Sequence, residues 1–166
     1  MNNYEIAYGL GKNPSFELDH VRANERVPFV RVAEEIRHEV NGAEIVLRKY
    51  DIRLTGMNDG SAFKVQTAHT LEHLLSGLFR KEFGSSYIDL SPMGCMTGFY
   101  LTVFHSDAIT PEKICRFLAG AVDAIASIDE VPGASIRTCG AYLSHDLNAA
   151  KELASRVFPK LKPYTS

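Results

Sequence analysis

The sequence predicts an α+β fold, a single domain with helices packed on one face of an antiparallel sheet. The chain has 166 residues and is 45% hydrophobic, which suits one globular domain with a sizeable core. Short β-branched and aromatic segments are separated by turn-forming residues, as in hairpins. Other segments repeat apolar residues at three- and four-residue spacing, as amphipathic helices do.

Composition and charge exclude several classes of protein. The formal net charge of -2 gives no footprint for nucleic acid or a membrane surface. No run is long enough to span a membrane, and the N-terminus lacks the basic and apolar segments of a secretory signal. Three cysteines argue against a disulfide framework and for reduced thiols. We therefore expect a cytoplasmic protein.

The first half of the chain is predicted to be an arm followed by strands. Residues 1–14 are rich in Gly and Asn and predict a loose arm, so that one domain occupies residues 15–166. Residues 27–36 fit a strand or a helix. Asn41-Gly42 is a tight-turn signal, and residues 44–54 after it predict a long strand.

A helix is predicted in the middle of the chain, followed by two more strands. Thr67 is a suitable N-cap for this helix, and Gly84 is a suitable C-terminal residue. Residues 87–90 predict a short strand and residues 91–98 a turn-rich loop. Residues 99–104 are β-branched and aromatic, which predicts another strand.

Two further helices and a strand are predicted in the C-terminal third. Thr110 and Pro111 form a capping and first-turn pair. The helix after them has an apolar stripe, formed by Ile114, Leu118, Ala121, Ile125 and Ile128. Residues 134–143 predict a strand, and residues 144–146 then cap a last helix at residues 147–158.

The central helix contains an H-x-x-E-H motif formed by His69, Glu72 and His73. Positions four apart lie on one face of a helix, so the two histidines point the same way with the glutamate beside them. This is the inverted form of a zinc-protease signature. The plain alternative is a pair of half-buried histidines on an amphipathic helix, so a metal site requires a third ligand elsewhere.

Five residues are candidates for that third ligand: Cys95, Cys115, Cys139, His145 and Glu152. Cys115 lies inside an amphipathic helix and is best interpreted as a small buried hydrophobe. Cys95 and Cys139 each adjoin a glycine, where backbone can approach a ligand or substrate closely. Either can be the ligand and the other a reactive thiol. Glu152 is the ligand expected of an inverted-motif protease, although a solvated helix face is its more ordinary role.

Other polar residues carry little signal by spacing alone. Asp51 and Arg53 fall on the face of the predicted strand opposite its apolar residues, which favours solvent exposure. Asp89 suits a turn acceptor, and Ser15 and His20 suit the surface.

Five motifs nevertheless occur in a specific order. They are Ser15-Phe-Glu-Leu-Asp-His20, Lys49-Tyr-Asp-Ile-Arg53, His69-Thr-Leu-Glu-His-Leu-Leu75, Asp89-Leu-Ser-Pro-Met-Gly-Cys-Met-Thr-Gly98, and Cys139-Gly140 through His145-Asp-Leu147. Together they closely resemble the LuxS family of S-ribosylhomocysteine lyases. The similarity runs from about residue 15 to the last helix, nearly the whole chain. The arm before it is longer than the family suggests, and residues 21–48 match poorly.

The resemblance implies specific roles for the candidate residues. It assigns the metal to His69, His73 and Cys139, and the acid–base pair to Glu72 and Cys95. The implied substrate contacts are Ser15, His20, Arg53 and Asp89. The implied metal is one divalent ion per subunit, Fe2+ first and Zn2+ or Co2+ as alternatives.

The resemblance also implies a reaction and an assembly. The reaction is metal-assisted carbonyl migration in S-ribosylhomocysteine, followed by β-elimination of the thioether. Its products are homocysteine and 4,5-dihydroxy-2,3-pentanedione, the precursor of autoinducer-2 in quorum sensing. The implied assembly is an α+β homodimer with two active sites at the subunit interface.

Two other interpretations remain open from the residues. A metalloprotease predicts Glu152 as third ligand and a chamber for peptides. A metal-stabilised structural or signalling module predicts a closed site, with Cys95 as fourth ligand beside the two histidines and Cys139.

Overall fold

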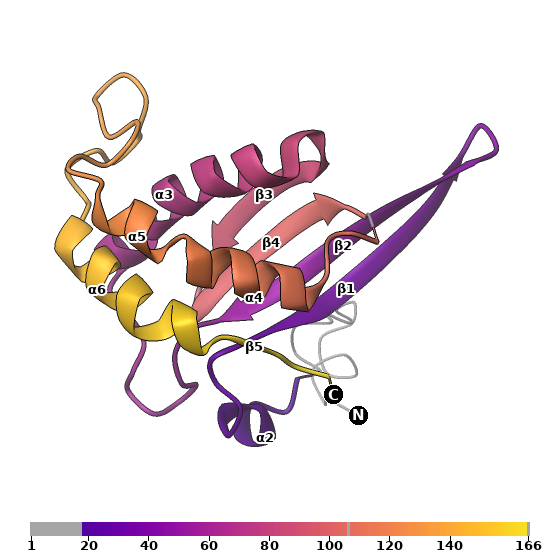
Figure 1. The fold of residues 1–166 in the computed structure, drawn as a ribbon, viewed down its shortest axis with the longest axis horizontal. Coiled ribbons are helices and arrows are strands. Elements are labelled where there is room, and N and C mark those ends of the chain that lie inside the picture. The colour runs from indigo at the N-terminus through magenta and orange to yellow at the C-terminus, as the bar shows by residue number, and fades with distance from the viewer. Residues whose placement is uncertain (1–17, 106, 166) are drawn as a thin grey trace, which may run out of the picture.

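The computed structural model describes residues 18–105 and 107–165. Its elements in chain order are α2 (His20–Asn24), β1 (Phe29–Val40), β2 (Ala43–Arg53), α3 (Val65–Phe83), η2 (Gly84–Ser86), β3 (Tyr87–Pro92), β4 (Gly98–Phe104), α4 (Pro111–Gly120), α5 (Val122–Ala126), α6 (Leu147–Val157), η3 (Phe158–Lys160) and β5 (Lys162–Pro163). The strands form a five-stranded sheet in the order β3-β4-β2-β1-β5. Helices α3, α4 and α6 lie together over one face of this sheet (Figure 1). The predicted α+β class is confirmed.

The sheet is antiparallel except for its short last strand, since β5 pairs with β1 in parallel. The predicted arm at residues 1–14 and the candidate Ser15 lie outside the described residues. None of the helices in the described part of the chain is both long and apolar enough to cross a membrane.

Strands β1 and β2 form a long hairpin that extends beyond the helical layer (Figure 1). Its turn is the predicted Asn41-Gly42 pair, with φ values of 53° and 78°. Both residues occupy the left-handed region, which a tight two-residue hairpin turn requires and which Asn and Gly tolerate. Within the ambiguous segment 27–36, residues 29–36 belong to strand β1 and the first two residues precede it.

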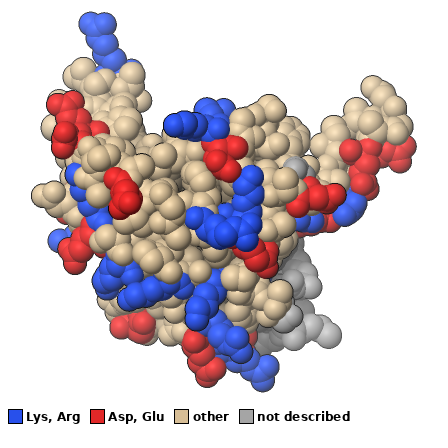
Figure 2. Space-filling view, viewed as in Figure 1, with Lys and Arg blue, Asp and Glu red and all other residues tan. Residues whose placement is uncertain are grey.

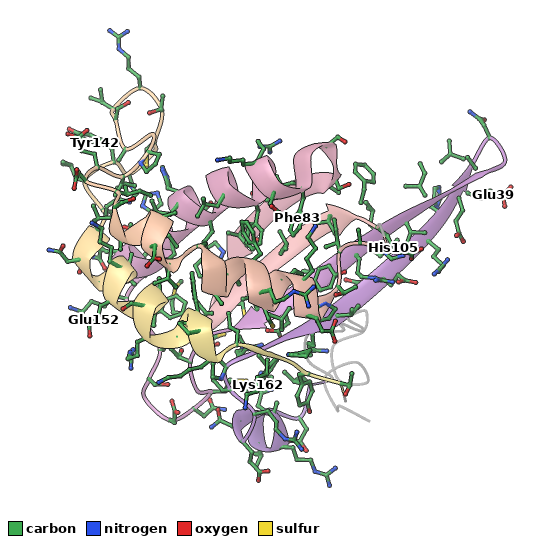
Figure 3. All side chains as sticks on the ribbon, in the orientation of Figure 1. Glu39, Phe83, His105, Tyr142, Glu152 and Lys162 are labelled. Atoms are coloured by element: carbon green, nitrogen blue, oxygen red, sulfur yellow. The ribbon has the colours of Figure 1, made fainter. Side chains whose placement is uncertain are left out.

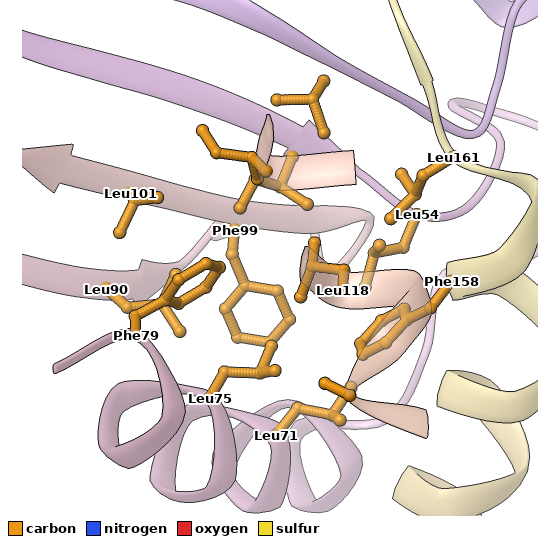
Figure 4. Packing of buried hydrophobic residues seen from close by; sticks show 14 of the residues in the cluster. Leu54, Leu71, Leu75, Phe79, Leu90, Phe99, Leu101, Leu118, Phe158 and Leu161 are labelled. Atoms are coloured by element: carbon orange, nitrogen blue, oxygen red, sulfur yellow. The ribbon is translucent and has the colours of Figure 1, made fainter. Parts of the chain in front are cut away.

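The core lies between the sheet and the helices (Figure 4). Alternate residues of the strands point into it, including Ile52 and Leu101, each no more than 1% exposed. From the other side α3 contributes Leu71 and Leu75, both 0% exposed. The period of two in the strands and the period near 3.6 in α3 thus bury matching apolar faces.

The predicted exposure of Asp51 and Arg53 is wrong, because both are buried, at 0% and 2%. They point away from the core, as the alternation predicts, but they pair with each other on that face. Arg53 donates from Nε and Nη2 to the two carboxylate oxygens of Asp51, at 3.2 and 2.9 Å. Arg31 adds an ion pair to the same carboxylate at 3.4 Å. Buried charges persist when paired in this way.

The N-cap of helix α3 lies three residues earlier than predicted. This residue is Lys64, which makes no side-chain capping bond, and the predicted cap Thr67 is buried inside the helix. The C-terminal prediction is confirmed, since Gly84 ends the helix with φ of +55°. The earlier N-terminus does not change the helix face on which His69 and His73 lie.

The long helix predicted after Thr110 is two helices. The cap is confirmed, because the Thr110 hydroxyl accepts a hydrogen bond from Lys113 N at 3.2 Å. The chain then breaks at Ala121, the C-cap of α4 and the N-cap of α5. The apolar stripe continues across the break, so Ile125 is as fully buried as Ile114. Asp146 caps α6 through Ala149 N, as the last predicted cap requires.

Residues 134–143 are a loop of turns, so the predicted strand is wrong. The loop projects from the body of the molecule between α5 and α6 (Figure 1). Its hydrogen bonds are local: Ser135 O accepts from Thr138 N and Cys139 N, and the Thr138 hydroxyl donates to Gly133 O. Gly133 also has φ of +72°, a turn conformation. These local bonds replace the pairing that a strand would need.

Candidate active site

Four metal-binding side chains converge where α3 meets the loop before α6. His69 and His73 come from α3, Cys139 from the loop and His145 from the residue before the α6 cap. Their ligand atoms all lie within 4.8 Å of one another. Cys139 Sγ is 3.3 Å from His69 Nε2 and 3.8 Å from His145 Nε2. The helix face that His69 and His73 share, as the H-x-x-E-H spacing predicts, thus contributes two of the four donors in this cluster.

Backbone carbonyls fix the tautomers of the two helix histidines. His69 Nδ1–H donates to Ser144 O at 2.9 Å, and His73 Nδ1–H donates to Pro132 O at 2.7 Å. A carbonyl oxygen only accepts, so each Nδ1 holds the proton and each Nε2 lone pair is free. This is the outer-sphere arrangement that orients histidine ligands in metal sites.

A side-chain hydroxyl fixes the tautomer of His145. The Thr70 hydroxyl donates to Gln66 O at 2.9 Å and accepts from Asp146 N at 2.9 Å. Its remaining lone pair faces His145 Nδ1 at 3.3 Å, so this nitrogen is the donor and Nε2 has a free lone pair. Burial, together with nearby His69 and His73, lowers the pKa of His145 and favours the neutral, metal-binding imidazole.

The donor chemistry fits a soft or borderline divalent metal. Imidazole and thiolate suit zinc, iron(II) and cobalt, whereas magnesium and calcium take oxygen ligands. Tetrahedral coordination with ordinary Zn–N and Zn–S lengths separates a nitrogen donor from a sulfur donor by about 3.6 Å. The two distances from Cys139 Sγ, 3.3 and 3.8 Å, lie on either side of that value.

The other third-ligand candidates lie elsewhere. Glu152 is exposed on the outer side of α6 and is absent from the cluster (Figure 3). The solvated helix face favoured for it is confirmed, and the protease alternative, in which it is the third ligand, is not supported. Cys115 is buried in α4 as expected, and burial raises the pKa of its thiol to about 11. Glu72 lies on α3 between His69 and His73 and is half-buried.

Cys95 lies in the loop between β3 and β4, where two donors approach its sulfur. Thr97 Oγ1 is 3.0 Å from Cys95 Sγ, and Arg53 Nη1 is 3.8 Å from it. Arg53 Nη1 also donates to Thr97 Oγ1 at 2.8 Å, which leaves the threonine hydroxyl proton free for the sulfur. A guanidinium and a hydroxyl thus lie beside the Cys95 sulfur as hydrogen-bond donors. Asp51 holds Arg53 in this orientation.

A cavity of about 480 Å³ lies beside Cys95. Its lining includes His20, Cys95, Thr97 and residues of the loop after β2. His20 Nδ1 lies 2.8 Å from Leu18 O, so its Nδ1–H donates there and Nε2 is free. Within the described residues, none of the four metal-binding side chains lines this cavity. The cavity is therefore a separate thiol-containing part of the site.

The loop that lines the cavity is tied to α2 by one side chain. Asn24 donates from Nδ2 to Met57 O at 3.2 Å and accepts from Met57 N at 2.8 Å. Asp89, in contrast, is exposed on β3 opposite Thr102 and does not line the cavity. The structure thus groups His20 and Arg53 around Cys95, but not Asp89.

Sequence reasoning missed Thr97 and Thr70 as supports of the site. A signal existed for each: Thr97 follows Cys95 by two positions, and Thr70 adjoins His69. The sequence indicates His145 only as one candidate for a third ligand, because spacing does not reveal that four donors meet.

Comparisons with known proteins match this chain over most of its length. A family model described as S-Ribosylhomocysteinase (LuxS) matches residues 14–164. The chain belongs to the LuxS family. The match spans both the metal-binding cluster and the Cys95 cavity, and it confirms the resemblance seen in the motifs.

Curated relatives in the LuxS family are similar over nearly their whole length. A protein of Thermus thermophilus is 45% identical over 144 residues, 86% of each chain. One from Enterococcus faecalis is 41% identical over 148 residues, 89% of this chain and 91% of its own. One from Helicobacter pylori is 38% identical over 146 residues, 88% of each. All three are named S-ribosylhomocysteine lyase.

Proposed function

We propose that this chain is a metal-dependent carbon–sulfur lyase that cleaves S-ribosylhomocysteine to homocysteine and 4,5-dihydroxy-2,3-pentanedione. The observation that carries the proposal is a cluster of nitrogen and sulfur metal donors in a LuxS-family chain that also has a thiol cavity. The protease hypothesis loses its third ligand, since Glu152 lies outside the cluster. The structural-module hypothesis loses its predicted fourth ligand, since Cys95 lies outside it too.

We assign the metal to His69, His73 and Cys139, with Fe2+ as the expected ion and Zn2+ or Co2+ as alternatives. When bound, such an ion supplies a Lewis acid for a substrate oxygen. The Nδ1–H bonds to Ser144 O and Pro132 O support the assignment, because each fixes the orientation of its imidazole ring and leaves Nε2 as the donor atom.

Carbonyl migration needs a base that removes a C–H proton and returns it to the neighbouring carbon. We assign this shuttle to Cys95 Sγ. Its contacts with Arg53 Nη1 and Thr97 Oγ1 support the assignment, because both groups can donate hydrogen bonds to the sulfur and hold it at the edge of the cavity. After two such shifts the sulfur is on the carbon β to the carbonyl, and loss of a proton from the intervening carbon expels the homocysteine thiolate.

We assign proton transfer at oxygen, and in the elimination, to Glu72. Its place between His69 and His73 on α3 supports this role, because the carboxylate shares the helix face of the donors. The proposed substrate contacts are Ser15, His20, Arg53 and Asp89. Of these, His20 has the most direct support, since it lines the same cavity as Cys95.

A homodimer is proposed from the sheet face opposite the helices. At its outer end that face carries apolar side chains that are 38–49% exposed, namely Ile36, Val40, Ile45 and Phe104. The other face of the hairpin is ionic, with Arg37 paired to Glu35 and Glu44. Exposed apolar residues gathered on one side favour contact with another protein surface. The separation of the Cys95 cavity from the metal-binding cluster supports an active site completed by a second subunit.

On the face of the molecule seen in Figure 2, acidic and basic side chains are interspersed, so the charges of this face do not favour a nucleic-acid partner. The three free cysteines support the cytoplasmic location that we propose. We also propose that residues 15–166 act as one catalytic domain, in keeping with the family match over 14–164.

Product analysis tests the function. Metal-loaded protein is incubated with S-ribosylhomocysteine, the dicarbonyl is trapped with an aromatic diamine, and both products are measured by mass spectrometry. We expect homocysteine and the trapped pentanedione in equal amounts. Homocysteine without the dicarbonyl, or hydrolysis of peptides instead, contradicts the proposal.

A further inference from the structure

We propose that Asn24 is a positioning residue for the substrate, because its side chain holds helix α2 and the loop after β2 together as two walls of the Cys95 cavity. The substrate part of this proposal rests on the proposed function. Asn24 belongs to none of the five motifs that carry the family resemblance, since the first of them ends at His20 and the second begins at Lys49.

Both ends of the Asn24 amide bind the backbone of one residue, Met57, which is 33 positions away. Asn24 donates from Nδ2 to Met57 O at 3.2 Å, and Asn24 Oδ1 accepts from Met57 N at 2.8 Å. A backbone N–H only donates and a carbonyl oxygen only accepts, so this pair of bonds needs a short side chain with one donor and one acceptor. Asparagine has both. The amide therefore fixes the Met57 backbone at two points.

Asn24 also ends the short helix that carries His20. Helix α2 has only five residues, so its internal hydrogen bonds contribute little to holding it in place. It lies apart from the layer formed by α3, α4 and α6 (Figure 1). Its buried residue belongs to a small apolar cluster that is separate from the main core. The buried members of this cluster are Leu18, Ala23, Phe29 and Met57. Met57 thus joins α2 twice, through its side chain in the cluster and through its backbone at Asn24.

The loop after β2 is anchored to the Cys95 loop near both of its ends. At its start, Leu54 N and Thr55 N donate to Thr97 O at 2.9 and 3.1 Å. At its end, Phe63 N donates to Met96 O at 2.9 Å. These backbone bonds hold the two ends of the loop beside the thiol, but they do not reach its middle.

The middle of the loop, residues 56–62, has few hydrogen bonds. Ser61 binds Asp59 and Gly56 O, and both partners lie within the loop. In the part of the chain that the structure describes, the two bonds to Asn24 are the only hydrogen bonds that join residues 56–62 to another segment. The position of the loop middle therefore depends on Asn24.

This part of the loop and α2 form walls of the cavity beside the thiol. Met57 and Asn58 line the cavity together with His20 and Cys95, whereas Asn24 does not line it. Without the two bonds, α2 and the loop middle can separate, and a bound substrate has to restore their arrangement at a cost in affinity. We therefore expect Asn24 to affect substrate binding rather than the chemical step.

Hydrogen–deuterium exchange on zinc-loaded protein without substrate tests whether Asn24 holds the loop. Asn24→Leu keeps the shape of the side chain but loses both bonds, so peptides that cover residues 55–61 should exchange at least about fivefold faster than in the wild type. Asn24→Ala guards against a packing defect caused by leucine and should give the same result. Glu25→Ala is the matched control, since this exposed neighbour at the end of α2 should leave the exchange unchanged. Wild-type protection of residues 55–61 in both folded Asn24 variants overturns the proposal.

Steady-state kinetics tests the effect on the substrate. The KM for S-ribosylhomocysteine should rise about tenfold in Asn24→Leu and Asn24→Ala, while kcat stays within about twofold of the wild type, because the lost bonds weaken ground-state and transition-state binding equally. The metal content should equal that of the wild type, because Asn24 lies outside the metal-binding cluster. A wild-type KM in both variants, or a lower kcat at unchanged KM, contradicts the role in positioning.

The two measurements separate this proposal from the proposed function. An inactive wild type contradicts the proposed function, and the exchange result then still decides whether Asn24 holds the loop. An active wild type with unchanged exchange and kinetics in the Asn24 variants contradicts this proposal alone.

Discussion

Arg53 joins a buried carboxylate to the thiol of the loop between β3 and β4. Two of its nitrogens bind Asp51, and Nη1 lies 3.8 Å from Cys95 Sγ while donating to Thr97 Oγ1 at 2.8 Å. The carboxylate fixes the guanidinium, and the guanidinium and the hydroxyl together face the sulfur. The reactivity of Cys95 should therefore depend on Asp51 and Thr97, neither of which is a proposed substrate contact.

Thr97→Val tests the hydroxyl in this chain of contacts. The variant removes the hydroxyl beside Cys95 Sγ while keeping the shape of the side chain, so the sulfur loses a hydrogen-bond partner. A neutral hydrogen bond contributes about 1 kcal/mol, so alkylation of Cys95 by iodoacetamide near pH 7 should slow about fivefold. Thr97→Ser keeps the hydroxyl and should react at nearly the wild-type rate. Equal rates for Thr97→Val and the wild type would show that the contact does not affect the reactivity of the Cys95 sulfur.

Cys115 should resist alkylation in the folded protein. Its pKa is raised from 9.0 to about 11, chiefly by burial, so at pH 8 it is a thiol shielded by the core. Because the folded state disfavours the charged form, stability from this group is present below pH 9 and falls as pH rises toward 11. Mass spectrometry after labelling at pH 8 should find Cys95 modified and Cys115 intact. Rapid labelling of Cys115 before unfolding would contradict its burial.

Measuring the metal content of variants should distinguish the candidate metal ligands from the candidate acid–base residues. Cys139→Ala removes a donor of the cluster, so the purified protein should lose most of its metal. Glu72→Gln should keep metal and lose turnover by at least about 100-fold, the usual scale of a lost acid–base group. Glu152→Ala is the matched control, since this exposed residue should affect neither. A metal-free Glu152→Ala protein would revive the protease hypothesis.

The hairpin should contribute to self-association. Ile36→Asp and Ile45→Asp each place a charge in the exposed apolar group of the uncovered sheet face, at 49% and 38% exposure in the wild type. Sedimentation equilibrium should show a wild-type dimer and a concentration-dependent shift toward monomer in both variants. Glu39→Gln changes a polar residue near the hairpin tip (Figure 3) and serves as the control. If the dimer dissociation constant of all three variants equals that of the wild type, the interface lies elsewhere.

The parts of the fold that sequence predicted are those determined by neighbours in the chain. The Asn41-Gly42 turn follows from the backbone freedom of two residues, and the Thr110 cap follows from one hydroxyl three residues from its partner. The shared direction of His69 and His73 likewise follows from helix geometry alone.

The parts that it missed depend on distant contacts. His69 meets Ser144, 75 positions away, and no periodicity connects the two. The buried state of Asp51 and Arg53 was missed because a polar strand face usually meets solvent, whereas here the charges satisfy one another. The loop around Cys139 has residues that suit a strand, but turns at Gly133 and Ser135 hold it near α3. His145 joins the cluster through that loop.

Thiol release from S-ribosylhomocysteine tests the central claim most directly. The protein is purified anaerobically, its metal is counted, and homocysteine formation is followed with a thiol reagent in wild type and Cys95→Ala. We predict homocysteine release by the wild type and its disappearance in the variant at equal metal content. No release from metal-replete wild-type protein, or undiminished release by Cys95→Ala, would contradict the account.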